Sequence, residues 1–93
     1  MTIVRVEKVE DCFDGSSVYR YWLDRTWTRE DILGLQALGE LEYFADFPRP
    51  FFRLHCPDGM QAKGVEGEDN CQAVFPSRDR ETIRERLEAF LQR

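Results

Sequence analysis

Long apolar segments are missing from this chain of 93 residues. A helix that crosses a bilayer needs about 20 consecutive apolar residues, and no stretch of the sequence comes near that length. The first residues, M-T-I-V-R-V-E-K, carry charges where a secretory signal needs an apolar core. We therefore expect a cytoplasmic protein without a membrane partner.

Disulfide and metal-binding motifs are missing as well. The cysteines, Cys12, Cys56 and Cys71, are an odd number without close spacing, and the chain has one histidine, His55. Because no C-x₂-C or H-x₃-H spacing occurs, we expect reduced thiols, no metal site and no cofactor. His55 and Cys56 have the chemistry of a base and a nucleophile, but neighbours on a strand point to opposite faces. We therefore predict no catalytic residue.

Positive charge is scarce in this sequence. The 13 Lys and Arg residues are outnumbered by 18 Asp and Glu residues, which gives a net charge of -5. An acidic chain repels phosphates and anionic headgroups, so neither nucleic acid nor a membrane is expected as a partner. Hydrophobic residues make up 42% of the chain. This length and composition predict a single domain, residues 1–93, with one core that needs no cross-links.

The first half of the chain predicts a hairpin followed by a helix. Residues 2–9 and 18–23 have strand-like patterns, and Asp-Gly-Ser-Ser at 14–17 is a turn between them. The second strand is apolar on both faces, which is typical of a strand inside a sheet. Thr28 and Asp31 form a capping box that starts a helix, and Gly39 supplies a left-handed C-cap after about three turns.

The central stretch Tyr43–Phe52, Y-F-A-D-F-P-R-P-F-F, has five aromatic residues around Pro48-Arg49-Pro50. Each proline fixes φ and removes a backbone donor, so residues 48–50 are predicted to be a stiff connector between two extended segments. Two interpretations of the rings remain open. They form the core of the sheet, or one register leaves Phe44 and Phe51 on an open face as a docking patch.

The second half of the chain predicts a meander and a final helix. Turns at Pro57-Asp58-Gly59 and at 67–70 separate strands at 51–56, 60–66 and 71–76. Gly64, inside one of these strands, indicates a bulge or a bulky ring lying across it. Ser77 is predicted to cap a helix whose buried stripe contains Ile83, Leu87, Phe90 and Leu91. Arg84 and Glu88 are expected to pair on its solvent side.

These elements predict an α+β fold, a two-layer sandwich. We expect a mainly antiparallel sheet of about five strands, in the order β-β-α-β-β-β-α, with both helices on one face.

Two classes of function fit this sequence. The first is a non-catalytic module that binds a protein partner, or associates with itself, through an interaction surface at Phe44, Phe47, Arg49 and Phe51. Arg beside aromatic residues is typical of interface centres, and a stiff connector loses little entropy on binding. Alternatively, the prolines only shorten a hairpin and discourage edge pairing. The second class is a small ligand-binding protein or enzyme with a pocket between the sheet and the helices.

Overall fold

The computed structural model of the chain describes residues 1–92, and its hairpins turn where the sequence predicted turns. Gly15, Gly59 and Gly67 each have a positive φ, which glycine adopts without steric cost, and each lies between two antiparallel strands. The elements in chain order are β1 (Ile3–Asp11), β2 (Ser17–Leu23), α1 (Arg29–Gly34), η1 (Leu35–Ala37), β3 (Glu40–Phe44), β4 (Phe51–His55), β5 (Gln61–Val65), β6 (Asn70–Phe75) and α2 (Arg80–Leu91).

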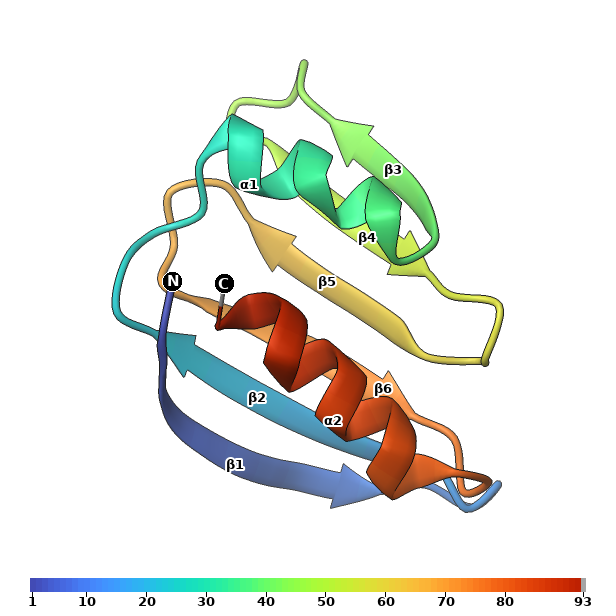
Figure 1. Cartoon of the computed structure of the whole chain (residues 1–93). Coiled ribbons are helices and arrows are strands. Elements are labelled where there is room, and N and C mark those ends of the chain that lie inside the picture. Colours follow the sequence, from blue (N-terminus) through green and yellow to red (C-terminus); the bar gives the residue numbers. More distant parts are fainter. Residues whose placement is uncertain (93) are drawn as a thin grey trace.

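The strands form an antiparallel sheet in the order β1-β2-β6-β5-β4-β3 (Figure 1). Strands β3 to β6 follow one another as a meander, and β2 pairs with β6, so β1 and β3 are the edges. The expected α+β class with a mainly antiparallel sheet is therefore confirmed. Residues 1–92 form six strands and not about five, because the segment before the proline connector makes a strand of its own, β3.

Both helices lie on the same face of the sheet, α1 against β3 and α2 against β6 (Figure 1). Since successive strand residues point to opposite faces, every second residue of the inner strands faces these helices. The resulting core contains Tyr21, Leu23, Phe52, Leu54, Ala73 and Phe75 from the sheet and Ile32, Leu35, Ile83 and Leu87 from the helical segments. We call this side the helix-covered face and the other side the helix-free face.

Gly64 lies in β5 directly opposite Phe52 of β4, and the Phe52 ring covers it. A Cβ atom at position 64 would come within 2.7 Å of that ring, which is far too close. The predicted bulky neighbour of Gly64 is thus a ring of the central aromatic stretch. A residue without a side chain lets Phe52 lie flat in the core, where it is 1% exposed.

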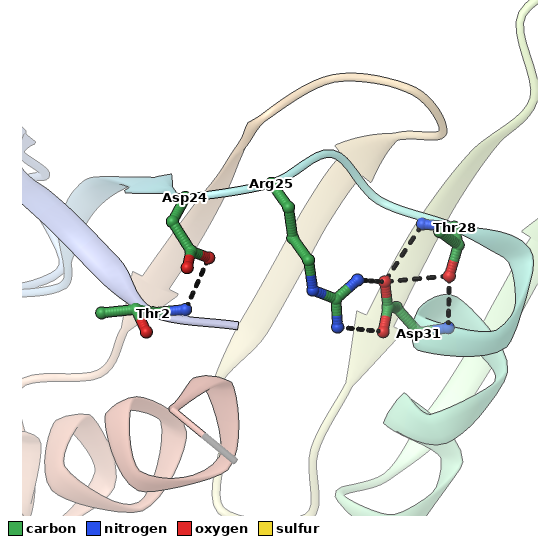
Figure 2. Close-up of polar contacts among 5 residues, drawn as sticks. All are labelled: Thr2, Asp24, Arg25, Thr28 and Asp31. Carbon is green, nitrogen blue, oxygen red and sulfur yellow. Dashed lines mark hydrogen bonds and ion pairs between the residues drawn. The ribbon is translucent and has the colours of Figure 1, made fainter.

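The predicted capping box at the start of α1 is confirmed, and an ion pair reinforces it (Figure 2). The Asp31 backbone N–H donates to Thr28 Oγ1, and the Asp31 carboxylate accepts from the Thr28 N–H. Both terminal nitrogens of Arg25 donate hydrogen bonds to the same carboxylate, at 2.5 and 2.8 Å. These contacts, led by the Arg25 hydrogen bonds, lower the pKa of Asp31. Nearby, the Thr2 N–H donates to Asp24, which ties the N-terminus to the end of β2.

The C-terminal end predicted for this first helix is wrong. The α-helix ends at Gly34, a 3-10 turn follows, and Gly39 does not have a positive φ. Position 39 needs a glycine because the backbone of β4 passes very close to it. A Cβ at this position would lie 2.5 Å from the backbone oxygen of His55. Gly39 therefore lets the chain enter β3 directly beside the end of β4.

The start predicted for the second helix is also wrong. Asp79, with φ 57°, is the N-cap residue of α2, and it makes no side-chain capping bond. Ser77 lies against the first hairpin, where a Cβ on Gly15 would come within 3.0 Å of the Ser77 Cβ, and Arg80 donates to the Gly15 carbonyl. The sequence before α2 therefore fixes the hairpin turn instead of capping the helix. Neither α2 nor any other helix within residues 1–92 is long and apolar enough to span a membrane.

Arg84 and Glu88 of α2 form the predicted ion pair, at 3.2 Å, but they are half-buried against the sheet and not on the solvent side of the helix. Glu88 accepts a hydrogen bond from the hydroxyl of Tyr21, and the Arg84 guanidinium lies over the ring of Tyr19 at 4.4 Å. The buried Tyr21 hydroxyl requires a polar partner and the Tyr19 ring attracts a cation, so this pair lies between α2 and β2.

Candidate functional site

The rings of the central aromatic stretch divide between the two faces of the sheet. Tyr43 pairs with Phe52, and these two rings lie on the helix-covered face. The next pair, Phe44 and Phe51, therefore lies on the helix-free face, where the two rings stack at 4.5 Å with an interplanar angle of 17°. The core interpretation therefore holds for Tyr43 and Phe52, whereas Phe44 and Phe51 lie on the open face, where the docking patch stays a prediction.

Phe47, from the connector between β3 and β4, completes a group of three rings. Its ring meets Phe51 at 5.2 Å and Phe44 at 6.0 Å, in both cases edge to face. Phe47 is nevertheless 53% exposed, and Phe44 and Phe51 are half-buried. We call these three residues the ring cluster. A cluster of this kind offers preformed apolar area to a partner, because its rings already hold one another in place.

Arg49, the fourth predicted site residue, pairs with an acid of another turn. Its guanidinium forms an ion pair with Glu68 in the turn between β5 and β6, and its side chain is 72% exposed. The cation that does lie over the ring cluster is Arg53 of β4, at 5.9 Å from the Phe44 ring and 6.0 Å from the Phe51 ring. Sequence reasoning missed Arg53, although the alternation of β4 places it two residues after Phe51 on the same face.

Two shallow hollows lie on the helix-free face, with volumes of about 330 and 400 Å³. The first reaches from Phe51 to Arg20 and has Glu68 in its lining, and the second is lined by Val18, Val74, His55 and Glu10 among others. Arg53, Lys63 and Gln72 line both hollows. The middle of this face is therefore a ridge of long polar side chains between two depressions.

His55, Cys56 and Cys71 do not form a catalytic arrangement. His55 faces Glu42 on the helix-free face, with 3.2 Å between Nε2 and Oε1, whereas Cys56 follows β4 and packs against the core. Burial and the negative charge of Asp58 raise the pKa of Cys56 to about 11, and burial raises that of Cys71 to about 12. At neutral pH both are thiols, and a thiol is a poor nucleophile. Within residues 1–92 no group of three His, Cys, Asp or Glu side chains is arranged to hold a metal ion.

The hollow beside the two helices is small. It measures about 200 Å³ and is lined by Trp27, Asp31, Phe90 and neighbouring residues of α1 and α2. Pockets for small ligands usually measure about 300 to 1,000 Å³. The charged groups Arg25 and Asp31 in its wall already pair with each other. This geometry favours the helix-free face over the helical side as the functional surface.

Comparisons with models of protein families, with curated proteins and with solved structures find no match to this chain. A proposal about function therefore depends on the chain's own geometry.

Proposed function

We propose that this chain is a non-catalytic protein-interaction module. It binds a partner protein, or a second copy of itself, through the ring cluster on the helix-free face. The observation that supports this most strongly is the exposure of Phe47, which stands on two further rings on the side of the sheet opposite the helices. Burying an aromatic ring of this size is favourable, and residues that dominate binding free energy are often aromatic rings or Arg.

The edge position of β3 adds to this proposal. The outer side of β3 has no strand partner within residues 1–92, and the ring cluster lies where β3 meets the proline connector. A partner can therefore contact the rings and the free backbone groups of this edge together. Recognition at sheet edges commonly combines backbone hydrogen bonds with side-chain contacts in this way.

The test compares Phe47→Ser with Phe13→Ser. Phe13 lies at the tip of the first hairpin and is fully exposed, so the two substitutions remove the same ring from different places. Self-association is measured by light scattering, and retention of partner proteins on the immobilised chain is measured from lysate. We expect Phe47→Ser to reduce association and Phe13→Ser to leave it unchanged. Equal association of both variants and the parent chain would contradict the proposal.

Arg49→Ala is a second variant for the same experiment, because Arg49 is exposed beside the cluster but pairs with Glu68. If the interface extends over the connector, this substitution lowers association less than Phe47→Ser does. Each variant is first shown by denaturant unfolding to be fully folded under the conditions of the association assay, so that a loss of association cannot come from unfolding.

A further inference from the structure

The helix-free face gathers positive charge at its centre, although the whole chain has a net charge of -5. Across neighbouring strands, Arg20 of β2 pairs with Gln72 of β6, Gln72 with Lys63 of β5, and Lys63 with Arg53 of β4. Directly paired residues point to the same face, so these four side chains stand side by side. We call them the cationic row.

None of the three cations in this row has a carboxylate partner within residues 1–92. Arg20 donates to the side-chain oxygen of Asn70 at 3.2 Å, and Arg53 lies over the rings of the cluster. Six cations elsewhere in residues 1–92 do pair with acids, as in Arg25 with Asp31 and Arg86 with Asp58. Unpaired cations in an acidic chain leave a local positive potential that attracts a negative partner.

The pairing of Lys63 with Arg53 works against stability. Like charges directly opposite each other on adjacent strands repel, and both side chains are exposed on the same face. Arg53 is held by the rings of the cluster, but within residues 1–92 Lys63 has no carboxylate partner that would offset this repulsion. Two positive side chains at this spacing are well placed to contact one carboxylate between them, which would remove the repulsion.

The extent of the row limits what can bind there. From β2 to β4 it crosses three strand spacings, about 14 Å in all, which is the length of about four extended residues. An acid flanks the row at each end, because Glu7 of β1 is opposite Arg20 in the strand register and Glu42 of β3 is opposite Arg53. A nucleic-acid backbone would continue past these acids and meet repulsion, whereas a short acidic peptide segment ends before it reaches them.

We propose that the cationic row binds a short acidic segment of a partner protein. Carboxylates of the segment contact Lys63, Arg53 and Arg20, its backbone lies over the two hollows, and a neighbouring apolar side chain packs on the ring cluster. This inference rests on the proposed function and names the chemistry of its partner. Arg53 joins the two halves of the surface, because it belongs to the row and also lies over the rings.

The probe is a short fluorescein-labelled peptide of glutamates around one central phenylalanine, and its binding is followed by fluorescence anisotropy. A second peptide has glutamines in place of the glutamates. The test variant is Lys63→Gln, and the matched control is Arg78→Gln, which removes a positive charge from the exposed loop before α2. We expect Lys63→Gln to weaken binding about two- to fivefold, Arg78→Gln to leave it unchanged, and the glutamine peptide not to bind.

A second measurement separates binding from folding. Because Lys63→Gln relieves repulsion with Arg53, we expect this variant to be at least as stable to denaturant as the parent chain while it binds the peptide less well. Binding is also expected to weaken as salt is raised, since exposed charge pairs are screened. A loss of affinity that follows a loss of stability would overturn the inference.

Three results separate this inference from the proposed function. If the acidic peptide does not bind but Phe47→Ser still lowers association, the inference of an acidic partner is wrong and the binding role proposed for the ring cluster is supported. If the peptide binds through Lys63 but Phe47→Ser changes nothing, the binding role proposed for the ring cluster is wrong and the role proposed for the cationic row is supported. If oligothymidylate binds in place of the peptide and Lys63→Gln weakens it, the partner is a nucleic acid and the inference fails.

Discussion

Neighbouring aromatic residues of β4 lie in different surroundings on the two faces of this sheet. Phe52 faces the helices and is 1% exposed, while Phe51, the residue before it, points to the helix-free face and stacks on Phe44. On the first face the rings are covered by α1, α2 and the rest of the core. On the second they remain half-buried under Phe47, which is itself more than half exposed. Substitutions on the first face should therefore change stability, and substitutions on the second should change association.

The largest loss of stability is expected for Leu87→Ala on the helix-covered face. Leu87 is 2% exposed, so the substitution removes buried methyl groups and leaves a cavity that costs about 2 to 5 kcal/mol. Glu85→Ala on the exposed side of α2 should stay within about 0.5 kcal/mol. Unfolding by denaturant measures both. Equal effects would mean that α2 does not pack through the side described here.

A smaller loss is expected for Gly64→Ala, which places a methyl group against the Phe52 ring. Because the ring is buried and cannot easily move, the clash should cost about 1 to 3 kcal/mol. The matched change is Gly34→Ala at the end of α1, where an added Cβ meets no atom within 4 Å. That substitution should stabilise by about 0.5 to 1 kcal/mol. We therefore expect the midpoint temperature of thermal unfolding to fall for Gly64→Ala and to rise for Gly34→Ala. Equal changes in the two variants would contradict the packing of Phe52 over β5.

A pH-dependent effect of about 1 kcal/mol is expected for Asp31→Ala, which removes the capping box and the pairing with Arg25. The pKa of Asp31 is lowered in the folded chain, so its contribution is complete above the unfolded value near 4. It is lost as pH falls through the lower folded value.

Parent and variant should therefore differ in unfolding free energy at about pH 7 and converge in strong acid. Asp46→Asn is the control, since Asp46 is exposed and has no ion pair within residues 1–92. A difference that persists unchanged in acid would assign the cost to something other than the carboxylate.

The smallest effect on stability is expected for Phe47→Ser on the helix-free face. The exposed ring contributes only edge contacts to Phe44 and Phe51, so the loss should be less than about 1 kcal/mol. The same variant should have the largest effect on association. If unfolding measurements show a loss as large as that of Leu87→Ala, the ring cluster is part of the core and not a binding surface.

Local patterns were sufficient to predict much of the fold. The capping box at Thr28 and Asp31 involves residues three apart, and the glycine turns follow from backbone sterics, so each could be predicted from a few residues. A ring over Gly64 was one of two alternatives that the sequence allowed there, the other being a bulge, and the structure shows the ring. The end of α1 and the start of α2 could not be predicted in this way. Gly39 and Ser77 take their roles from β4 and from the first hairpin, which are distant in the sequence.

The candidate site was predictable only in part, for a related reason. Phe44, Phe47 and Phe51 share one short stretch, and strand alternation predicts which way each paired ring points. The cationic row joins residues from four strands, and its existence depends on the register of each strand with the next. Since a shift of one residue would turn Lys63 to the other face, no local pattern could predict the row.

Site-specific photocrosslinking tests the central claim most directly. A benzophenone amino acid replaces Phe47 on the helix-free face in one version of the chain and Glu85 on the outer side of α2 in another, and both are irradiated in the cells that make the protein. We predict covalent adducts to a partner protein or to a second copy from position 47 and none from position 85. Adducts from position 85 alone, or equal adducts from both positions, would contradict a binding surface on the helix-free face.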